Sequence, residues 1–519
     1  MSGILEHLVI VPIVLPLAAG AAMLLFDERR LRLKAAAGLA ASLLVLACAL
    51  ALMQIAQARA TLVYSLGNWP APFGIVLVAD RLSALMVLLA SVLVLAALAF
   101  SLARWQRVAP HWHSLVQFLA AGVNGAFLTG DLFNLFVFFE LLLAASYGLA
   151  LHGSGTARVR ASLHYIVMNL AASLLFLIGV SLLYGATGTL NMADLALRMA
   201  AVEPADRALV EIGAAALGIA FLVKAGMWPV GFWLPAVYAS ASAPAAALFA
   251  ILSKVGVYAV LRIWLLVFAG GEGGELLIYG GMATLVFGLT GVLASQDLAR
   301  LASYSLLVTS GTLLAAIGFG GPAITAAALY YLVASTLGIA AFFLLIELVE
   351  RSREPGADLI AVTAEAFGLT ADDEQEPKEE VGVVIPAAMA LLGIAFACSA
   401  LVIAGLPPLP GFVAKFALLA ALLEADPVPV TAWVLLALVM LSGLAAIIAL
   451  NRAGMRVFWA TPDRSTPRVR VLELAPVALL LALCIALAAA AGPALRYMSE
   501  AAHALHAPHR YIEEVLSTP

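Results

Sequence analysis

Two stretches decide the fold: LVKAGMWP at residues 222–229 and LVIAGLPP at residues 401–408. They are 179 positions apart (401 minus 222), and Leu, Val, Ala, Gly and Pro recur in the same register. The predicted breaks are at Gly226, Pro229, Gly405, Pro407 and Pro408. Because Gly and Pro interrupt helices, matching breaks in the two halves of an apolar chain predict the discontinuous membrane helices of a transport site.

The composition is that of a polytopic helical membrane protein. Of 519 residues, 64% are hydrophobic and only 11% charged, with a mean hydropathy of +1.07. The net charge of −4 comes without any basic tract, so no nucleic-acid partner is expected. The three cysteines lie in apolar segments without ligand spacing, which predicts no disulfide, metal or cofactor. We therefore expect an all-α membrane protein that is not an enzyme, with the lipid bilayer as its surroundings.

Apolar segments of about 20 residues predict about fourteen membrane spans. Their approximate cores are 4–26, 34–56, 81–103, 113–130, 132–151, 162–185, 208–229, 242–268, 276–295, 301–319, 322–349, 383–404 continuing through 411–424, 430–451 and 473–494. Residues 61–79 predict a short extramembrane hairpin, and 191–207 a surface helix. The first span is expected to be retained, because no basic region precedes it.

Loops that follow odd-numbered spans hold most of the arginines, for example Arg29, Arg30, Arg104, Arg158 and Arg452. The positive-inside rule therefore places these loops in the cytoplasm and both termini outside. The linker 350–380 holds ten acidic and three basic residues. It is expected to be a solvated spacer, with partner binding as the alternative.

Lysine is used sparingly, and three of the five lysines lie in apolar spans. These are Lys224, Lys254 and Lys415, whereas Lys34 and Lys378 lie in loops. Arginine supplies 22 of the 27 basic residues. Arginine stays protonated in nearly every protein environment, whereas a desolvated lysine can release its proton. This division predicts a protein that moves protons through the membrane.

Glu140 is the only carboxylate deep in any predicted span. A buried carboxylate needs a cationic partner, and Lys224 is the first candidate. The alternative is that these four charged residues form structural ion pairs that only fix helix packing. Charged residues inside membranes are functional by default, so we predict a proton path.

Weaker candidates for that path are four polar residues: His164, Thr309, Ser335 and Thr336. His164 at the start of the sixth span would serve proton access, or lie at the interface as a capped histidine. The three hydroxyl residues lie in spans ten and eleven, where they would hold water or pack helices.

With these residues in hand, the chain resembles the antiporter-like subunits shared by respiratory complex I and the Mrp-type multisubunit cation/proton antiporters. The resemblance covers nearly the whole chain. Its motifs are FFEL at 138–141, LVKAG at 222–226, WLP at 233–235, SKVGVY at 253–258, the segment 297–304, and GLPPLPGF at 405–412.

The resemblance implies two inverted five-helix repeats with discontinuous helices 7 and 12. The implied domains are 1–103 (helices 1–3 and the hairpin), 113–270 (helices 4–8), 274–456 (helices 9–13 with linker 350–380) and 470–519 (helix 14 and tail). It also implies Glu140 and Lys224 as a coupling pair, Lys254 as the central relay and Lys415 as the terminal site. Implied partners are A, B, C, E, F and G-type subunits, protons and monovalent cations.

This chain departs from the family pattern in four places. Val230 and Gly231 follow the first break where the family often has a histidine, Ala236 replaces an acid, Ala334 or a residue near it lies where a histidine is expected, and Ala299 replaces a basic residue. The central path must therefore rely more on Lys254, hydroxyl groups and water than in some relatives.

We thus predict a proton-translocating subunit of a bacterial inner-membrane antiporter that exports sodium or a similar cation. The nearest alternative is a proton-pumping subunit of respiratory complex I or of a membrane-bound hydrogenase. A lipid-modifying enzyme would need polar groups clustered at one interface, whereas these charges lie mid-span. A passive scaffold would tolerate substitution of Glu140 and Lys415.

Overall fold

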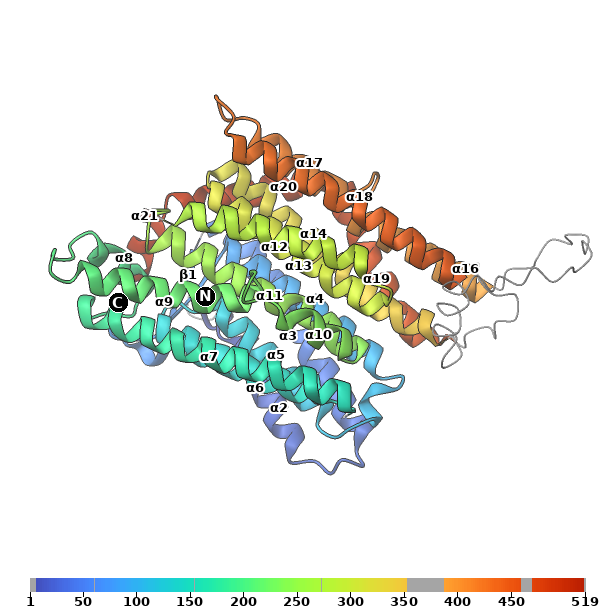
Figure 1. Cartoon of the computed structure of the whole chain (residues 1–519). Coiled ribbons are helices and arrows are strands. Elements are labelled where there is room, and N and C mark those ends of the chain that lie inside the picture. Colours follow the sequence, from blue (N-terminus) through green and yellow to red (C-terminus); the bar gives the residue numbers. More distant parts are fainter. Residues whose placement is uncertain are drawn as a thin grey trace, which may run out of the picture.

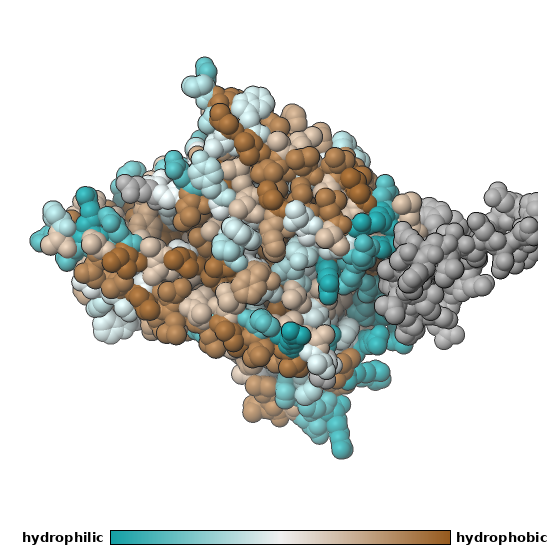
Figure 2. Space-filling model, viewed as in Figure 1, coloured by the Kyte–Doolittle hydropathy of each residue, from teal (hydrophilic) through white to brown (hydrophobic). Residues whose placement is uncertain are grey.

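The computed structural model describes residues 6–517, apart from 60, 154, 272, 352–386 and 459–468. Long helices run roughly parallel to one another and form one elongated bundle (Figure 1). Most of the predicted linker 350–380, including Lys378, lies outside the described residues. Figure 2 shows hydrophobic side chains over the flanks of the bundle, for example along α7, as expected of a surface in contact with lipid.

The first half of the described chain contains a two-stranded sheet and helices up to α11. In order, these are α2 (Val11–Leu24), α3 (Leu31–Arg59), β1 (Thr61–Ser65), η1 (Leu66–Asn68), β2 (Val76–Asp80), α4 (Arg81–Ser101), η2 (Trp105–Arg107), α5 (Trp112–Leu128), α6 (Leu132–Leu151), α7 (Thr156–Thr187), α8 (Met192–Met199), α9 (Arg207–Ala225), α10 (Trp233–Ser240) and α11 (Ala243–Leu266).

The described secondary-structure elements of the second half are all helices. They are α12 (Gly274–Ala294), α13 (Leu298–Phe319), α14 (Pro322–Glu350), α16 (Ala387–Ala404), α17 (Pro410–Leu422), α18 (Val430–Phe458), α19 (Val471–Ala489), α20 (Ala491–His506) and α21 (His509–Leu516).

Twelve predicted spans are confirmed as described helices that are long and apolar enough to cross a membrane. The first predicted span corresponds to the shorter apolar helix α2 and the fourth to the 17-residue α5, and α17 continues the span that begins in α16. β1 and β2 form the predicted hairpin, pairing antiparallel from Thr61 with Asp80 to Ser65 with Val76. The predicted surface helix is α8.

Two five-span groups follow one another with opposite orientation. The first is α5, α6, α7, α9 with α10, and α11; the second is α12, α13, α14, α16 with α17, and α18. The broken helix is the fourth span in each group. Because each group has an odd number of spans, the second group begins at the opposite end of the bundle, which makes the repeat inverted.

The loops divide between the two ends of the bundle as the alternation of spans requires. At the outer end, named here for the predicted topology, lie the β-hairpin, α8 and the C-terminal α21 (Figure 1). At the inner end, arginines join neighbouring loops, as Arg158 does by donating to the Ser240 carbonyl at 2.7 Å. Arg351 donates to Glu473 at 2.6 Å between α14 and the start of α19.

The tail after the last predicted span is helical: it forms α20 and α21, which pack against α14, α4, α8 and β1. One residue differs from the predictions. Lys34, predicted in a loop, lies in the first turn of α3, where it is buried and pairs with Glu28 at 2.6 Å. At the centre of the bundle, α11 is buried along its whole length and α14 along nearly all of it.

Candidate functional site

The first predicted break lies where α9 ends. Gly226 adopts a left-handed conformation with φ of 78°, which a residue with a side chain rarely adopts. The amide of Met227 donates to the carbonyl of Leu222 at 3.0 Å, so the helix ends in a Schellman motif. The chain resumes a helical course only at Trp233, where α10 begins.

The second break has the same backbone geometry. Gly405 has a φ of 79°, and the amide of Leu406 donates to the carbonyl of Leu401 at 3.0 Å. Both bonds join residues 179 positions from their counterparts at the first break. The predicted duplication of the broken helix is therefore present in the backbone as well as in the sequence.

A neighbouring helix lies close against each break through a glycine. A Cβ placed on Gly256 of α11 would lie 2.4 Å from the backbone nitrogen of Ala225. A Cβ on Gly443 of α18 would lie 2.9 Å from the carbonyl oxygen of Ala404. A side chain at either glycine would require the backbone to move. The fifth helix of each repeat therefore packs directly against the backbone of its broken helix.

Lys224 lies in the last turn of α9, within the first break. Its ammonium has no hydrogen-bond partner among the described residues and lies 4.9 Å from the centre of the Phe139 ring. It borders a small cavity of about 20 Å³ that Tyr165, Asn169 and Trp233 also line. A cavity of this size holds about one water molecule, and these polar groups supply partners for it.

Glu140 follows Phe139 on α6, and its carboxylate accepts a hydrogen bond from the hydroxyl of Ser173 on α7. In the described structure, no oxygen of Glu140 approaches the Lys224 nitrogen within the 4.0 Å of an ion pair. The two groups predicted to form a pair are thus neighbours, with the carboxylate bound to α7. Their coupling role stays a prediction.

Lys254 lies at the centre of the bundle on α11 and is fully buried. Its ammonium donates to the Thr309 hydroxyl of α13 at 2.6 Å. Thr309 also lines a second cavity of about 20 Å³, together with Ser305, Tyr331, Ser335 and Ser442. The structure therefore brings together Lys254 and two of the predicted relay hydroxyls, Thr309 and Ser335.

Lys415 lies in α17, and its side chain returns to the second break. Its ammonium donates to the carbonyl oxygen of Ala404 at 2.8 Å, where α16 ends. The carbonyl end of a helix carries a partial negative charge that favours a cation. Lys224 in the last turn of α9 occupies the equivalent end of the first half-helix.

Two predicted relay residues lie away from these lysines. His164 is exposed on the outer face of α7 and bonds to the Arg160 carbonyl at 2.9 Å. Thr336 is buried, and its hydroxyl donates at 2.6 Å to the Leu332 carbonyl of its own helix. Neither lines the two small cavities beside the lysines.

A polar stripe on α7 was not identified from the sequence. Ser162, Tyr165, Asn169 and Ser173 are buried and occupy one helical face, running from the inner end to Glu140. The opposite face is apolar and exposed, with Leu163, Val167, Leu170 and Leu174. A helix that is polar inside and apolar outside is typical of a protein that conducts ions through its interior.

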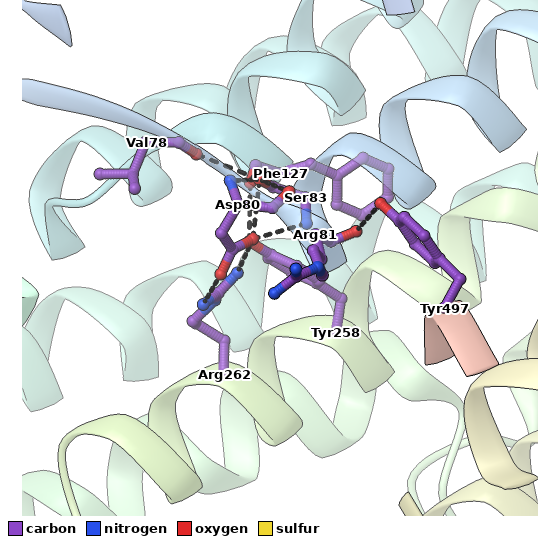
Figure 3. Close-up of polar contacts among 8 residues, drawn as sticks. All are labelled: Val78, Asp80, Arg81, Ser83, Phe127, Tyr258, Arg262 and Tyr497. Carbon is purple, nitrogen blue, oxygen red and sulfur yellow. Dashed lines mark hydrogen bonds and ion pairs between the residues drawn. The ribbon is translucent and has the colours of Figure 1, made fainter. Parts of the chain in front are cut away.

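Sequence reasoning also missed an ion pair at the outer end. Asp80, at the start of α4, accepts two hydrogen bonds from Arg262 of α11, at 2.6 and 2.8 Å (Figure 3). A signal was present in the sequence, since Arg262 lies inside an apolar span. No group of three His, Cys, Asp or Glu side chains that could hold a metal occurs among the described residues.

Comparisons with known proteins agree with this geometry. Residues 129–445 match a family described as NADH:quinone oxidoreductase/Mrp antiporter, transmembrane. The chain is 58% identical to the D-type subunit of a probable K(+)/H(+) antiporter of Rhizobium meliloti, over 100% of this chain and 99% of that protein. It is 35% identical to the D-type subunit of a Na(+)/H(+) antiporter of Alkalihalophilus pseudofirmus, over 99% and 100%. A chain of the Mrp complex from Dietzia sp. superposes with a TM-score of 0.85 at 27% identity, covering 99% and 100% of the two chains.

Proposed function

The chain belongs to the NADH:quinone oxidoreductase/Mrp antiporter family, and we propose that it is the proton-translocating D-type subunit of a multisubunit monovalent cation/proton antiporter. One observation carries the proposal: buried lysines lie at the carbonyl ends of two matched half-helices, with a third lysine between them. Each lysine can hold one proton, and no covalent chemistry is required.

The proton would pass between the two repeats through Lys254. Lys254 touches Thr309, and Thr309 lines the cavity that reaches Ser442 of α18. Lys415 lies against the same helix, because a Cβ on Gly443 would lie 3.3 Å from its ammonium. A water molecule in this cavity would extend the hydrogen-bonded path from Thr309, the partner of Lys254, toward Ser442, which precedes Gly443 beside Lys415.

Glu140 would act as the switch on Lys224. When Ser173 holds the carboxylate, the ammonium of Lys224 lies near Glu140 and the Phe139 ring but has no ion pair, and proton release is favoured. When the carboxylate turns to Lys224, the ion pair stabilises the bound proton. Moving one charge across 100 mV corresponds to about 2.3 kcal/mol. Forming or losing the ion pair between Glu140 and Lys224 would change the free energy of the bound proton by an amount in this range.

The polar stripe of α7 would connect Lys224 with the inner end. The hydroxyls of Ser162, Tyr147 and Tyr238 are buried without a partner among the described residues, and the Tyr147 and Tyr165 rings lie 5.1 Å apart. Buried polar groups are normally hydrogen-bonded, with water as the available partner. These tyrosines and serines would take the place of the histidine that the family often has after the first break.

The exported ion is proposed to be a monovalent cation. The two relatives above are a potassium and a sodium antiporter subunit. Our sequence-based prediction named sodium or a similar cation, so both ions belong in the test. The other subunits of the antiporter complex are the expected partners.

The proposal is tested with Lys224→Ala and Lys224→Arg in the complete complex, reconstituted in vesicles. Both variants should abolish proton movement driven by K⁺ or Na⁺ while all subunits still copurify. Arginine keeps the charge but does not release its proton, so it separates proton transfer from packing. Normal antiport by assembled Lys224→Arg would contradict the proposal, as would copurification with iron–sulfur subunits of a respiratory complex in place of antiporter subunits.

A further inference from the structure

One face of α11 carries three polar side chains in a row from the centre of the bundle to its outer end. Lys254, Tyr258 and Arg262 are spaced by four residues, which places them on the same helical face. Arg262 is about 12 Å from Lys254 along the helix axis. All three are at least 95% buried. Lys254 therefore has polar residues on two sides: Tyr258 toward the outer end of the bundle, and Thr309 toward Lys415.

Asp80 contacts the outer end of this face of α11, at Arg262. Its side chain caps α4 by accepting from the amide of Ser83 at 2.8 Å, and it holds the Arg262 guanidinium with both oxygens (Figure 3). The Tyr258 hydroxyl donates to the Phe127 carbonyl at 2.6 Å. The Arg262 guanidinium lies 5.5 Å from the centre of the Tyr258 ring. Tyr258 thus lies between Lys254 and the residue that holds the Asp80 carboxylate, in the order of residues along this face.

Exposure to solvent rises outward along this row. The side chain of Arg262 is 6% exposed and that of Asp80 13%. Arg81, the next residue, is 18% exposed and pairs at 3.2 Å with Glu500, which is 54% exposed. The charged groups therefore lead from the dry centre of the bundle to the surface.

We propose that Asp80 is the outer proton acceptor of the path to Lys254 and that Arg262 closes this path by pairing with Asp80. The inference rests on the proposed function, in which an antiporter driven by the proton gradient must accept protons from outside. The Asp80 carboxylate binds a proton and its pairing with Arg262 weakens. The proton then passes by way of the Tyr258 hydroxyl and water to the neutral amine of Lys254, which becomes an ammonium, and the regenerated carboxylate pairs with Arg262 again.

An ion pair with a purely structural role would not need to lie in line with a buried lysine of the path. Arg351 and Glu473 at the inner end provide the comparison, because they also form an ion pair between two elements, at 2.6 Å, in which Glu473 is buried and Arg351 is partly exposed. In the described structure, Arg351 bonds to Glu347 and Glu473, and none of the three path lysines lies beside this cluster. This pair is therefore a control for loss of an ion pair between two elements that lies away from the proposed path.

The charged or titratable groups that face the Asp80 pair come from three helices besides α4. They are Arg262 and Tyr258 of α11, Tyr497 and Glu500 of α20, and Tyr511 of α21, with Arg81 of α4 itself. Glu500 is the one other carboxylate among them. Glu500→Gln should therefore leave the response to outer pH unchanged, which separates its contribution from that of Asp80.

The experiment measures antiport by the whole complex in proteoliposomes, with the outer-side pH varied and the inner-side pH fixed. Asp80→Asn combined with Arg262→Gln removes both charges and leaves no buried charge unpaired. We expect this double variant to lose antiport at least tenfold per assembled complex. Asp80→Glu should retain activity with a shifted dependence on outer pH, and Arg351→Gln with Glu473→Gln should keep the wild-type rate per assembled complex.

Wild-type antiport by the assembled double variant would overturn the inference. If the double variant does not assemble, Asp80→Glu decides, because a dependence on outer pH identical to wild type would overturn the inference and a shifted one would support it. Failure here is distinguishable from failure of the proposed function, since the Lys224→Arg result does not depend on Asp80.

Discussion

Replacing Thr309 with valine should change how Lys254 holds its proton. The hydroxyl at 2.6 Å is the one hydrogen-bond partner of the Lys254 ammonium among the described residues, and Lys254 is fully buried. A hydrogen bond to a charged group contributes about 1.5–3 kcal/mol. Its loss disfavours the charged ammonium and leaves the neutral amine nearly unaffected. The protonated state of Lys254 should therefore lose about that much stability.

Because about 1.4 kcal/mol corresponds to one pH unit, the pH dependence of antiport should move about one to two units toward lower pH in Thr309→Val. At neutral pH the antiport rate should fall about tenfold or more. The assay is cation-driven proton movement in vesicles over a series of symmetrical pH values. Serine at the same position keeps a hydroxyl, so Thr309→Ser should restore most of the activity.

The chain offers a matched control in Thr336, a second buried threonine whose hydroxyl bonds only to its own helix in the described structure. Thr336→Val should leave both the rate and the pH dependence of antiport unchanged. Thr309→Val with the rate and pH dependence of the wild type would refute the assignment of Lys254 as the central relay. An equal shift in both variants would show that the effect comes from helix packing and not from the lysine.

Three further predictions follow from single contacts. Ser173→Ala frees Glu140 to pair with Lys224 and should slow antiport about tenfold, with Ser173→Thr as the active control. Gly443→Ala places a Cβ 2.9 Å from the Ala404 carbonyl, so it should lower stability by about 1–3 kcal/mol and impair antiport; Gly393→Ala, with 3.9 Å to its nearest neighbour, should do neither, as measured by thermal unfolding and transport. Burial raises the pKa of Glu28, but its hydrogen bond with Lys34 and its contacts with His111 lower it by more, so the pKa in the folded protein lies below 4.5. The contribution of these contacts to the stability of the fold is therefore complete above pH 4.5 and is lost as the pH falls through the lowered pKa. Glu28→Gln should remove this part of the acid dependence of Tm, which develops below about pH 5.

Local signals explain why the helix breaks were predictable. Gly226 and Gly405 both adopt a left-handed conformation that favours glycine, and the prolines that follow prevent the helix from continuing. The cap of α6 is equally local, since Asp131 accepts from the amide of Asn134 at 2.8 Å, as its position after Thr129-Gly130 predicts. Such features depend on a few adjacent residues, and the sequence contains all of them.

Partners across helices were not predictable in the same way. The sequence predicts a pair with Lys224 because Glu140 is a buried carboxylate that needs a cationic partner, but its carboxylate bonds to Ser173, 33 residues away. Which rotamer the carboxylate adopts depends on how α6 packs on α7, and spacing along the chain does not determine this. The Asp80–Arg262 pair joins residues 182 positions apart for the same reason.

The position of His164 could have been found from helical periodicity. Ser162, Tyr165, Asn169 and Ser173 repeat at intervals of three or four residues, which defines one face of α7. His164 falls on the opposite face, together with Leu163 and Val167. A histidine on the apolar face of a span lies toward lipid or a partner subunit and not toward the interior path.

The two breaks are alike in backbone and differ in how their lysines are held, and this difference bears on the direction of transport. Lys415 donates to a carbonyl of the broken helix, which stabilises its ammonium. While Ser173 holds Glu140, the Lys224 ammonium has no hydrogen-bond partner among the described residues and so lacks the hydrogen bond that Lys415 has. In this conformation a proton would leave from Lys224 toward the α7 stripe and be retained at Lys415. Return of Glu140 to Lys224 would reverse that order, so one carboxylate rotation would suffice to move the preferred proton site from one repeat to the other.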